Sequence, residues 1–191
     1  TVYGETLVTP EMLLPENQSC MRLVGTDGKA KMSKSLGNCI YLSDTSKDIK
    51  KKVNSMYTDP EHLQITDPGH VEGNVVFAYL DAFCEPEHFS KFLPEYENLD
   101  AMKDHYRRGG LGDGTCKKFL FNIMEDFLQP MRERRAQYEQ NIPLVYEILR
   151  KGSETARAEA AKTLADVRKA MKIDYFDDAD LIAEHTKKYQ K

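Results

Sequence analysis

Two lysines and two serines, side chains that can take part in chemistry, lie together in one short stretch, Lys31-Met32-Ser33-Lys34-Ser35. Two glycines precede this stretch and one follows it, at Gly25, Gly28 and Gly37, so the backbone there can bend and move. The two lysines stand beside two serine hydroxyls and several backbone N–H groups. A mobile loop with two ammonium groups and many hydrogen-bond donors suits a polyphosphate. The residues alone therefore predict either a phosphate-binding loop or a solvated turn with incidental lysines.

Residues 31–35, here named the lysine loop, and the Leu36-Gly37-Asn38 that follows resemble the second signature of the class I aminoacyl-tRNA synthetases letter for letter. In that family the loop closes over ATP while the amino acid attacks the α-phosphate. Its lysines stabilise the charge on the departing pyrophosphate. The resemblance implies this catalytic role for Lys31 and Lys34, with Mg²⁺ on the phosphates of ATP and no tightly bound cofactor. It also implies a set of ATP-binding residues: Lys31, Met32, Ser33, Lys34, Ser35 and Leu23.

The composition is that of a globular protein, because 40% of its 191 residues are hydrophobic and 30% are charged. No apolar run of about 18 residues predicts a membrane span, and no signal peptide is recognised at the start. The net charge of −4 argues weakly against a dedicated nucleic-acid binder, although basic clusters could still form a local RNA-binding face. The four cysteines form no C-x-x-C pair, so we predict no metal site, and reduced, buried thiols in a cytoplasmic protein.

The first 44 residues are predicted to form extended segments, turns and the lysine loop. Residues 1–24 hold the short apolar pieces Leu7-Val8 and Met21 to Val24, with prolines between them. Two short strands cannot make a stable sheet alone, so we expect this region to belong to a larger sheet that the chain lacks. Met21 or Leu23, just before the loop, would either pack on adenine or be an ordinary core residue.

Helical patterns dominate from residue 45 onward. Thr45 and Asp48 have the spacing of a capping box, and Ile49, Val53 and Met56 then form one apolar stripe. The connections are short, which favours antiparallel neighbours in a bundle. Further helices are predicted after the N-cap Asn74, over residues 86–108 with a break near Pro94, over about 114–140 with a kink at Pro130, from about 143 to 171, and at the C-terminus.

Two of these helices have apolar stripes that predict their buried faces. The stripe of the helix at 114–140 consists of Cys116, Phe119, Leu120, Ile123, Phe127 and Met131. The stripe of the helix that follows is rich in small residues, which permits close helix packing: Leu149, Gly152, Ala156, Ala160, Leu164, Val167 and Met171.

Several further stretches resemble the tryptophanyl-tRNA synthetases of the bacterial type within class I. The similarity extends from the lysine loop to about residue 173. The stretches are Ile40-Tyr41-Leu42-Ser43-Asp44, Met56-Tyr57-Thr58-Asp59-Pro60, Val71-Glu72-Gly73-Asn74, Val76-Phe77, Tyr79-Leu80-Asp81, His105-Tyr106-Arg107-Arg108-Gly109-Gly110-Leu111-Gly112-Asp113 and Arg132-Glu133-Arg134-Arg135-Ala136.

This resemblance implies a mainly α fold: a helical, anticodon-binding bundle over residues 45–191, preceded over residues 1–44 by a remnant of a Rossmann-type α/β catalytic domain. The first class I signature, His-x-Gly-His, is absent, and His70-Val71-Glu72-Gly73-Asn74 matches it only faintly. The chain is thus expected to be the C-terminal part of a homodimeric enzyme that activates tryptophan with ATP and transfers it to tRNA(Trp). Because the tryptophan pocket would lie in the missing half, we expect this part alone to be inactive.

Basic and aromatic residues in the helical region are candidates for tRNA binding. Single-stranded anticodon bases are read by stacking and edge hydrogen bonds, with cations on the phosphates. Helix capping and solvation explain Arg107, Arg108, Lys117 and Lys118 equally well. The candidates are Tyr106, Arg107, Arg108, Lys117, Lys118, Arg132 and Arg135.

Other functions compete with this prediction. A tyrosyl-tRNA synthetase is a structural cousin, although the Arg-Arg-Gly-Gly-Leu-Gly-Asp stretch at residues 107–113 argues against it. A helical RNA-binding module without chemistry would have no need of the lysine loop. A helical protein-interaction domain would expose an apolar face, whereas the stripes predict faces that are buried in a bundle.

Overall fold

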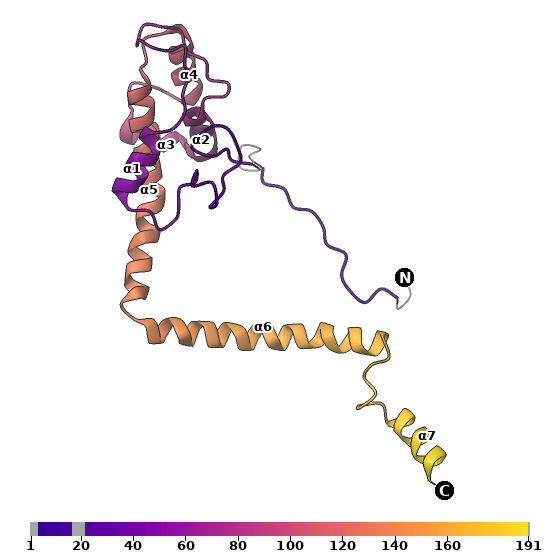
Figure 1. Cartoon of the computed structure of the whole chain (residues 1–191). Coiled ribbons are helices and arrows are strands. Elements are labelled where there is room, and N and C mark those ends of the chain that lie inside the picture. The colour runs from indigo at the N-terminus through magenta and orange to yellow at the C-terminus, as the bar shows by residue number, and fades with distance from the viewer. Residues whose placement is uncertain (1–3, 17–21, 191) are drawn as a thin grey trace. The chain divides into compact units, whose positions relative to one another are not determined.

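The computed structural model describes residues 4–16 and 22–190, so the predictions for Met21 and Cys20 fall outside the described residues. It forms two compact units, one of residues 14–137 and one of residues 1–13 with 138–191. Figure 1 labels the helices of the described residues, which are α1 (Ser46–Asn54), α2 (Val75–Phe83), α3 (Pro86–Phe92), α4 (Leu99–Arg108), α5 (Asp113–Glu139), α6 (Ile142–Ala170) and α7 (Ala179–Tyr189). The prediction of a mainly helical chain is confirmed.

The first part of the chain is extended but forms no strand among the described residues. A single antiparallel bridge joins Val24 to Lys31. Leu7, Val8, Met12 and Leu13 are exposed. No strand therefore forms from the described part of these apolar pieces, because a strand needs partners for its backbone groups that the described residues do not supply.

Helix α1 begins where its sequence predicts. Thr45 is the N-cap, and its hydroxyl and the Asp48 carboxylate form the reciprocal capping box. Ile49, Val53 and Met56 are buried, so the predicted apolar stripe is confirmed. Burying each such side chain contributes about 1.5–3 kcal/mol relative to leaving it in water.

Helices α2, α3 and α4 share the core of residues 14–137 with α1 and α5, and Figure 1 shows them gathered near the first half of α5. Asn74 caps α2 by accepting a hydrogen bond from the Val76 backbone N–H, as predicted. The predicted break near Pro94 separates α3 from α4. Helix α4 ends at Gly109, whose φ of 82° is costly for any residue with a Cβ atom.

Helix α5 runs through Pro130 to Glu139. Four members of its predicted stripe, from Cys116 to Ile123, are buried, but Phe127 is 47% exposed. Met124 and Leu128 take its place in the core. The physical reason is the 3.6-residue period: counted from Leu120, positions four and eight residues on face the core, and Phe127 lies at its edge against Phe83.

The second unit contains α6 and α7, and neither helix has a buried residue. Helix α6 starts at the Asn141 cap with Pro143 in its first turn, close to the predicted start at about residue 143. Its apolar stripe is exposed, including Leu149 and Leu164. The expected close packing of this stripe is therefore wrong for the described residues, because no element of its own unit covers the stripe.

The cysteines of the described residues are free thiols. Cys39 and Cys116 are buried, as predicted, whereas Cys84 is half-buried. Burial raises the pKa of Cys116 to about 12 and that of Cys84 to about 11, so both are protonated at neutral pH. No helix of the described residues combines the length and the apolar character that crossing a membrane requires.

Candidate functional site

The lysine loop is the second half of a backbone reversal that begins at Leu23. The Gly25 N–H donates to the Ala30 carbonyl at 2.7 Å, and the Met32 N–H donates to the Leu23 carbonyl at 3.3 Å. Between them lies the bridge of Val24 to Lys31. The lysine loop is therefore held at its start as the return arm of a short hairpin-like turn.

Asn38 organises the interior of this turn. Its side-chain oxygen accepts from the Ser33 N–H at 2.8 Å, and its amide nitrogen donates to Asp27 Oδ1 at 3.2 Å and to the Lys31 carbonyl at 3.4 Å. The residue is only 4% exposed. A Cβ atom on Gly25 would lie 2.1 Å from the Asn38 amide nitrogen, so a glycine is required there. The amide thus connects both arms of the turn.

The two lysines of the loop remain in solvent. Lys31 and Lys34 are exposed, and neither forms an ion pair within the described part of the chain. The Ser33 and Ser35 hydroxyls lie 2.9 Å apart, and the Gly37 N–H donates to the Lys34 carbonyl at 3.1 Å in the turn that ends the loop. The arrangement presents two ammonium groups and two hydroxyls to a ligand, as an anion site requires.

Two polar contacts fasten the turn to the helical core. The Tyr79 hydroxyl of α2 donates to the Val24 carbonyl at 2.9 Å, and the Tyr57 N–H donates to the Thr26 carbonyl at 3.3 Å. Met32 and Leu23 are partly buried and pack against the core cluster. Part of the Leu23 side chain therefore contacts the core.

A pocket of about 590 Å³ lies between the end of the lysine loop and the second half of α5. Lys34 lines this pocket from the loop and Arg135 lines it from α5, about a hundred positions further along the chain. Ile40, Leu42 and Met131 supply apolar walls. The fold thus brings a predicted ATP-binding residue and a predicted tRNA-binding residue to one cavity.

Tyr106 requires a correction. The sequence suggested that its ring could stack on an RNA base, but the side chain is fully buried. Its ring packs edge-on against His62 and Phe77, and its hydroxyl donates to Asp113 at 2.7 Å. Burial and the Asp113 carboxylate raise the pKa of this phenol far above its ordinary value. Tyr106 is a core residue because its position on α4 faces α2 and the loop before it.

The predicted cations around Gly109 and the start of α5 stay accessible. Arg107 pairs with Glu72 at 3.0 Å and with Asp104 at 3.1 Å, and Arg108 is exposed. Lys118, the residue after Lys117 on α5, is exposed. The Lys117 ammonium donates to the Asn54 carbonyl at 2.9 Å and thereby ties α5 to the end of α1.

Arg132 is less available than predicted. Its guanidinium donates to Glu125 at 2.7 Å, and each side chain is about four-fifths buried. One guanidinium nitrogen and one Glu125 oxygen are buried without a hydrogen-bond partner. Arg132 is therefore engaged within α5, whereas Arg135 lines the 590 Å³ pocket.

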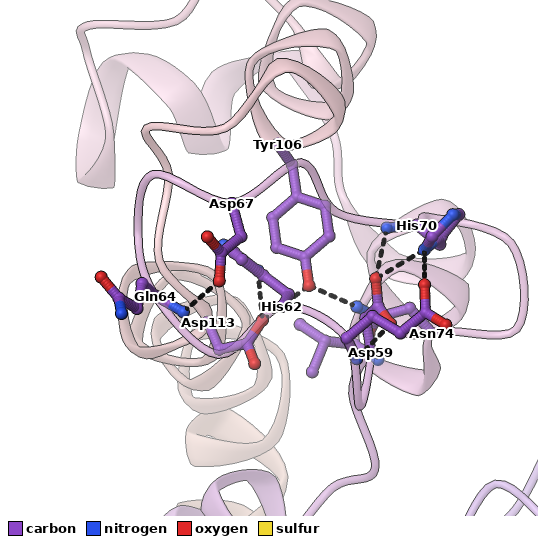
Figure 2. Close-up of polar contacts among 10 residues, drawn as sticks. Asp59, His62, Gln64, Asp67, His70, Asn74, Tyr106 and Asp113 are labelled. Carbon is purple, nitrogen blue, oxygen red and sulfur yellow. Dashed lines mark hydrogen bonds and ion pairs between the residues drawn. The ribbon is translucent and has the colours of Figure 1, made fainter.

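Sequence reasoning missed a polar cluster that surrounds the Tyr106 hydroxyl (Figure 2). This hydroxyl accepts from the Asn74 amide at 3.3 Å and donates to Asp113, whose Oδ1 lies 3.6 Å from His62 Nδ1. The signal that could have identified the cluster is weak, because its members stand up to 51 positions apart along the chain, from His62 to Asp113.

No group of three or more metal-ligating side chains gathers anywhere in residues 4–16 or 22–190. Among the described histidines, His62 and His70 each face one aspartate. A Zn²⁺ site takes four ligands or three plus water, so these pairs do not meet that requirement.

The lysine loop and most of the helical core lie in the region in which this chain matches known proteins. A family model described as tRNA synthetases class I (W and Y) matches residues 2–129. The tryptophan–tRNA ligase of Clostridium longisporum is 53% identical over 93% of this chain and 50% of its own length, and that of Streptococcus mutans is 52% identical over 92% and 50%. The chain spans about half the length of the curated relatives it matches.

The fold agrees with this relationship. A solved structure of tryptophanyl-tRNA synthetase from Campylobacter jejuni, complexed with ADP and tryptophan, superimposes with a TM-score of 0.65 at 27% sequence identity, over 88% of this chain and 48% of that one. The lysine loop lies inside the region that the family model matches. The chain therefore belongs to the class I tRNA synthetases of the tryptophan and tyrosine group.

Proposed function

We propose that this chain is the C-terminal half of a tryptophan–tRNA ligase, which activates tryptophan with ATP in the cytoplasm and transfers it to tRNA(Trp). The observation that supports this most is the lysine loop, with two exposed ammonium groups on a turn organised by Asn38, in a chain 53% identical to a tryptophan–tRNA ligase. The relatives with these identities are tryptophan ligases, which favours tryptophan over tyrosine as the substrate.

In this proposal Lys31 and Lys34 hold the triphosphate of ATP. As tryptophan attacks the α-phosphate, negative charge grows on the pyrophosphate, and the two ammonium groups offset it. Met32, Ser33 and Ser35 shape the loop and offer donors, and Leu23 supports it from the core. Mg²⁺ on the phosphates would neutralise further charge. Because Asn38 fixes Ser33 and Lys31 from inside the turn, little reorganisation is required when the substrate arrives.

The helical residues 45–191 are proposed to bind tRNA, with residues 1–44 as the remainder of the catalytic domain. Arg107, Arg108, Lys117 and Lys118 lie near the junction of α4 and α5, and Arg135 shares a pocket with Lys34. Cations at these two places would contact phosphates of the tRNA backbone. The full-length enzyme is proposed to be a homodimer whose other half supplies the tryptophan pocket.

The test is tryptophan-dependent exchange between pyrophosphate and ATP, measured on the full-length ligase and on residues 1–191 alone. Lys31→Ala and Lys34→Ala in the full-length protein are each expected to slow exchange by about 10²-fold or more. Lys29→Ala is the matched control, because Lys29 is an exposed lysine two positions before the loop. The isolated chain is expected to give no exchange.

Other outcomes would contradict the proposal in distinct ways. Exchange that is indifferent to both lysines would leave the loop as a solvated turn. Exchange with tyrosine and not with tryptophan would retain the class and change the substrate. Binding of tRNA without exchange by the full-length protein would support the RNA-binding module instead.

A further inference from the structure

Five lysines gather on one face that α1 and the start of α5 share, here named the α1–α5 face. Its members are Lys47, Lys50, Lys51, Lys117 and Lys118. On α1, Lys50 and Lys51 follow Lys47 by three and four positions, so one side of the helix carries all three, and all three are exposed. The opposite side of α1 carries the buried Ile49 and Val53.

Two contacts join the lysines of α1 to those of α5. The Lys50 ammonium lies 6.0 Å from the centroid of the Phe121 ring of α5. The Lys117 ammonium donates to the Asn54 carbonyl, at the end of α1, at 2.9 Å. Phe121 follows Lys117 and Lys118 by four and three positions, so these side chains share one side of α5. The α1–α5 face is therefore continuous across the two helices, which Figure 1 shows beside each other.

The α1–α5 face has no counter-charge of its own. None of its lysines forms an ion pair with a carboxylate in the part of the chain that the structure describes. The two carboxylates that flank the face along the chain have other partners. Asp44 pairs with Lys52, and Asp48 accepts from the Thr45 hydroxyl in the capping box. In a chain with a net charge of −4, the face is a local concentration of positive charge.

Helix stability does not account for this arrangement. Like charges three and four positions apart repel each other and destabilise a helix. The helix dipole favours cations in the last turn, where Lys51 lies, but disfavours them in the first turn, where Lys47 lies. The charges of the face therefore oppose one another until an anionic partner offsets them.

The chemistry of the face fits a phosphate backbone. A lysine ammonium is a point charge on a flexible stem, and it binds phosphate oxygens without the fixed geometry of a guanidinium. Contacts with phosphates position a nucleic acid but carry no sequence information. A double-stranded RNA stem presents phosphates and 2′-hydroxyls on its outside and is recognised mostly by shape. Lysines spread over two adjacent helices match such a surface.

We propose that the α1–α5 face binds the phosphate backbone of a tRNA stem without reading its sequence, and that it speeds the encounter with every tRNA instead of selecting one. Exposed charges at an interface change the association rate and its salt dependence more than they change dissociation. The inference rests on the proposed tRNA-binding function, to which it adds a surface that contributes affinity but no selectivity.

The test compares the binding of tRNA(Trp) and of one non-cognate tRNA transcript to the full-length ligase, between about 50 and 200 mM salt. The face variant carries Lys47→Gln, Lys50→Gln and Lys51→Gln together. It is expected to bind both transcripts about 10-fold or more weakly at the lowest salt concentration. The slope of log affinity against log salt concentration is expected to fall by about 1 for each lysine that contacts a phosphate. The loss is expected in the association rate constant, and the ratio of the two affinities is expected to stay the same.

The matched control carries Lys169→Gln, Lys187→Gln and Lys188→Gln, three exposed lysines of α6 and α7. It changes the net charge by the same amount and is expected to retain the affinities and the slope of the wild type. Folding is measured separately. Glutamine has nearly the helix propensity of lysine and relieves the repulsion on α1, so the unfolding midpoint of the face variant is expected to equal or exceed that of the wild type.

The inference is overturned, with the ligase function intact, if the wild type exchanges pyrophosphate normally and the face variant retains the affinity and slope for both transcripts. A loss confined to tRNA(Trp) would also overturn it, because the face would then select its partner. An equal loss in the control would assign the effect to net charge and count against the face. Absence of tryptophan-dependent exchange in the wild type would instead count against the proposed function itself.

Discussion

The turn that carries the lysine loop, residues 22–38, and the core of helices α1 to α5 are held together by different means. In the core, apolar side chains such as Phe77, Leu120 and Ile123 are fully buried, and helical periodicity places them there. In the turn, the shape depends on hydrogen bonds that converge on Asn38, while the lysines face solvent.

Because of this difference, substitutions in the core are expected to change mainly stability, and substitutions in the lysine loop mainly the reaction. A core side chain contributes through the area it removes from water, so its loss affects the whole unit. A side chain of the lysine loop contributes through charge at one position, so its loss affects one reaction. The turn and the core are connected by the hydrogen bond from the Tyr79 hydroxyl to the Val24 carbonyl, and Asn38 holds the turn in the shape that this bond requires.

The largest effect on stability is expected from Phe77→Ala in α2. Phe77 is fully buried and packs against Tyr106 with ring centroids 4.9 Å apart, so truncation leaves a cavity. We expect a loss of about 3–5 kcal/mol in the free energy of unfolding. Urea unfolding followed by circular dichroism would measure it, with Phe176→Ala as the control because Phe176 is 83% exposed. Equal losses in the two variants would contradict the division between core and surface.

A smaller effect on stability, joined to a loss of activity, is expected from Asn38→Ala. The substitution removes three hydrogen bonds and leaves the partly buried Ser33 N–H unpaired, at a cost of about 1–3 kcal/mol. The full-length ligase is also expected to exchange pyrophosphate more slowly, mainly through a raised KM for ATP. Thermal unfolding and exchange kinetics would be measured together.

The variant Asn38→Asp sharpens this test. It retains an oxygen for the Ser33 N–H but loses the amide donor to Asp27 and places a second carboxylate beside it. If Asn38 acts only by filling space, Asn38→Asp, whose side chain has nearly the same size, would unfold as the wild type does, and neither variant would change the KM for ATP. That result would remove the link between the turn and the substrate.

Much of the helical core follows from local sequence. The caps at Thr45, Asn74 and Asn141 and the stop at Gly109 mark helix ends through contacts within a few residues, which a sequence displays directly. The lysine loop was found in the same way, because its signature is contiguous.

The errors concern contacts between residues distant in the chain. Tyr106 was assigned to RNA because basic residues flank it, yet α4 turns its ring toward His62 and Phe77. The stripe of α6 reads as a buried face, but periodicity states only that a face is apolar and not that a neighbour covers it. The pocket lined by residues 62–65 and 112–115 is formed by two segments about 50 positions apart, and the sequence offers no local signal that they meet.

The smallest effect is expected at His70, in the loop between α1 and α2. His70 Nδ1 lies 2.8 Å from Asp59 Oδ2, which also accepts from the His70 backbone N–H at 2.7 Å. The hydrogen bond to Asp59 and its charge raise the pKa of His70 above its ordinary value of 6.5. Burial pushes the pKa of Asp59 upward, but the bonds from Glu61 and His70 outweigh this and leave it below its ordinary value.

The sign of the pH dependence follows from these two directions. The contribution of His70 to stability is complete below pH 6.5 and is lost as the pH rises through the raised pKa of the folded state. The contribution of Asp59 is present above its ordinary pKa of 3.8 and is lost as the pH falls through its lowered value. The pair therefore stabilises this loop most at mildly acidic pH, and weakly, because the His70 ring is largely exposed.

An NMR titration of the His70 ring protons would measure this directly. In the wild type the midpoint is expected above 6.5, and in Asp59→Asn it is expected to return toward that value. The stability difference between wild type and His70→Gln is expected to be larger at pH 5.5 than at pH 8.5. A midpoint that Asp59→Asn leaves unchanged would mean that the contact does not persist in solution. In that case the polar organisation seen around Asn38 would not extend to this second loop.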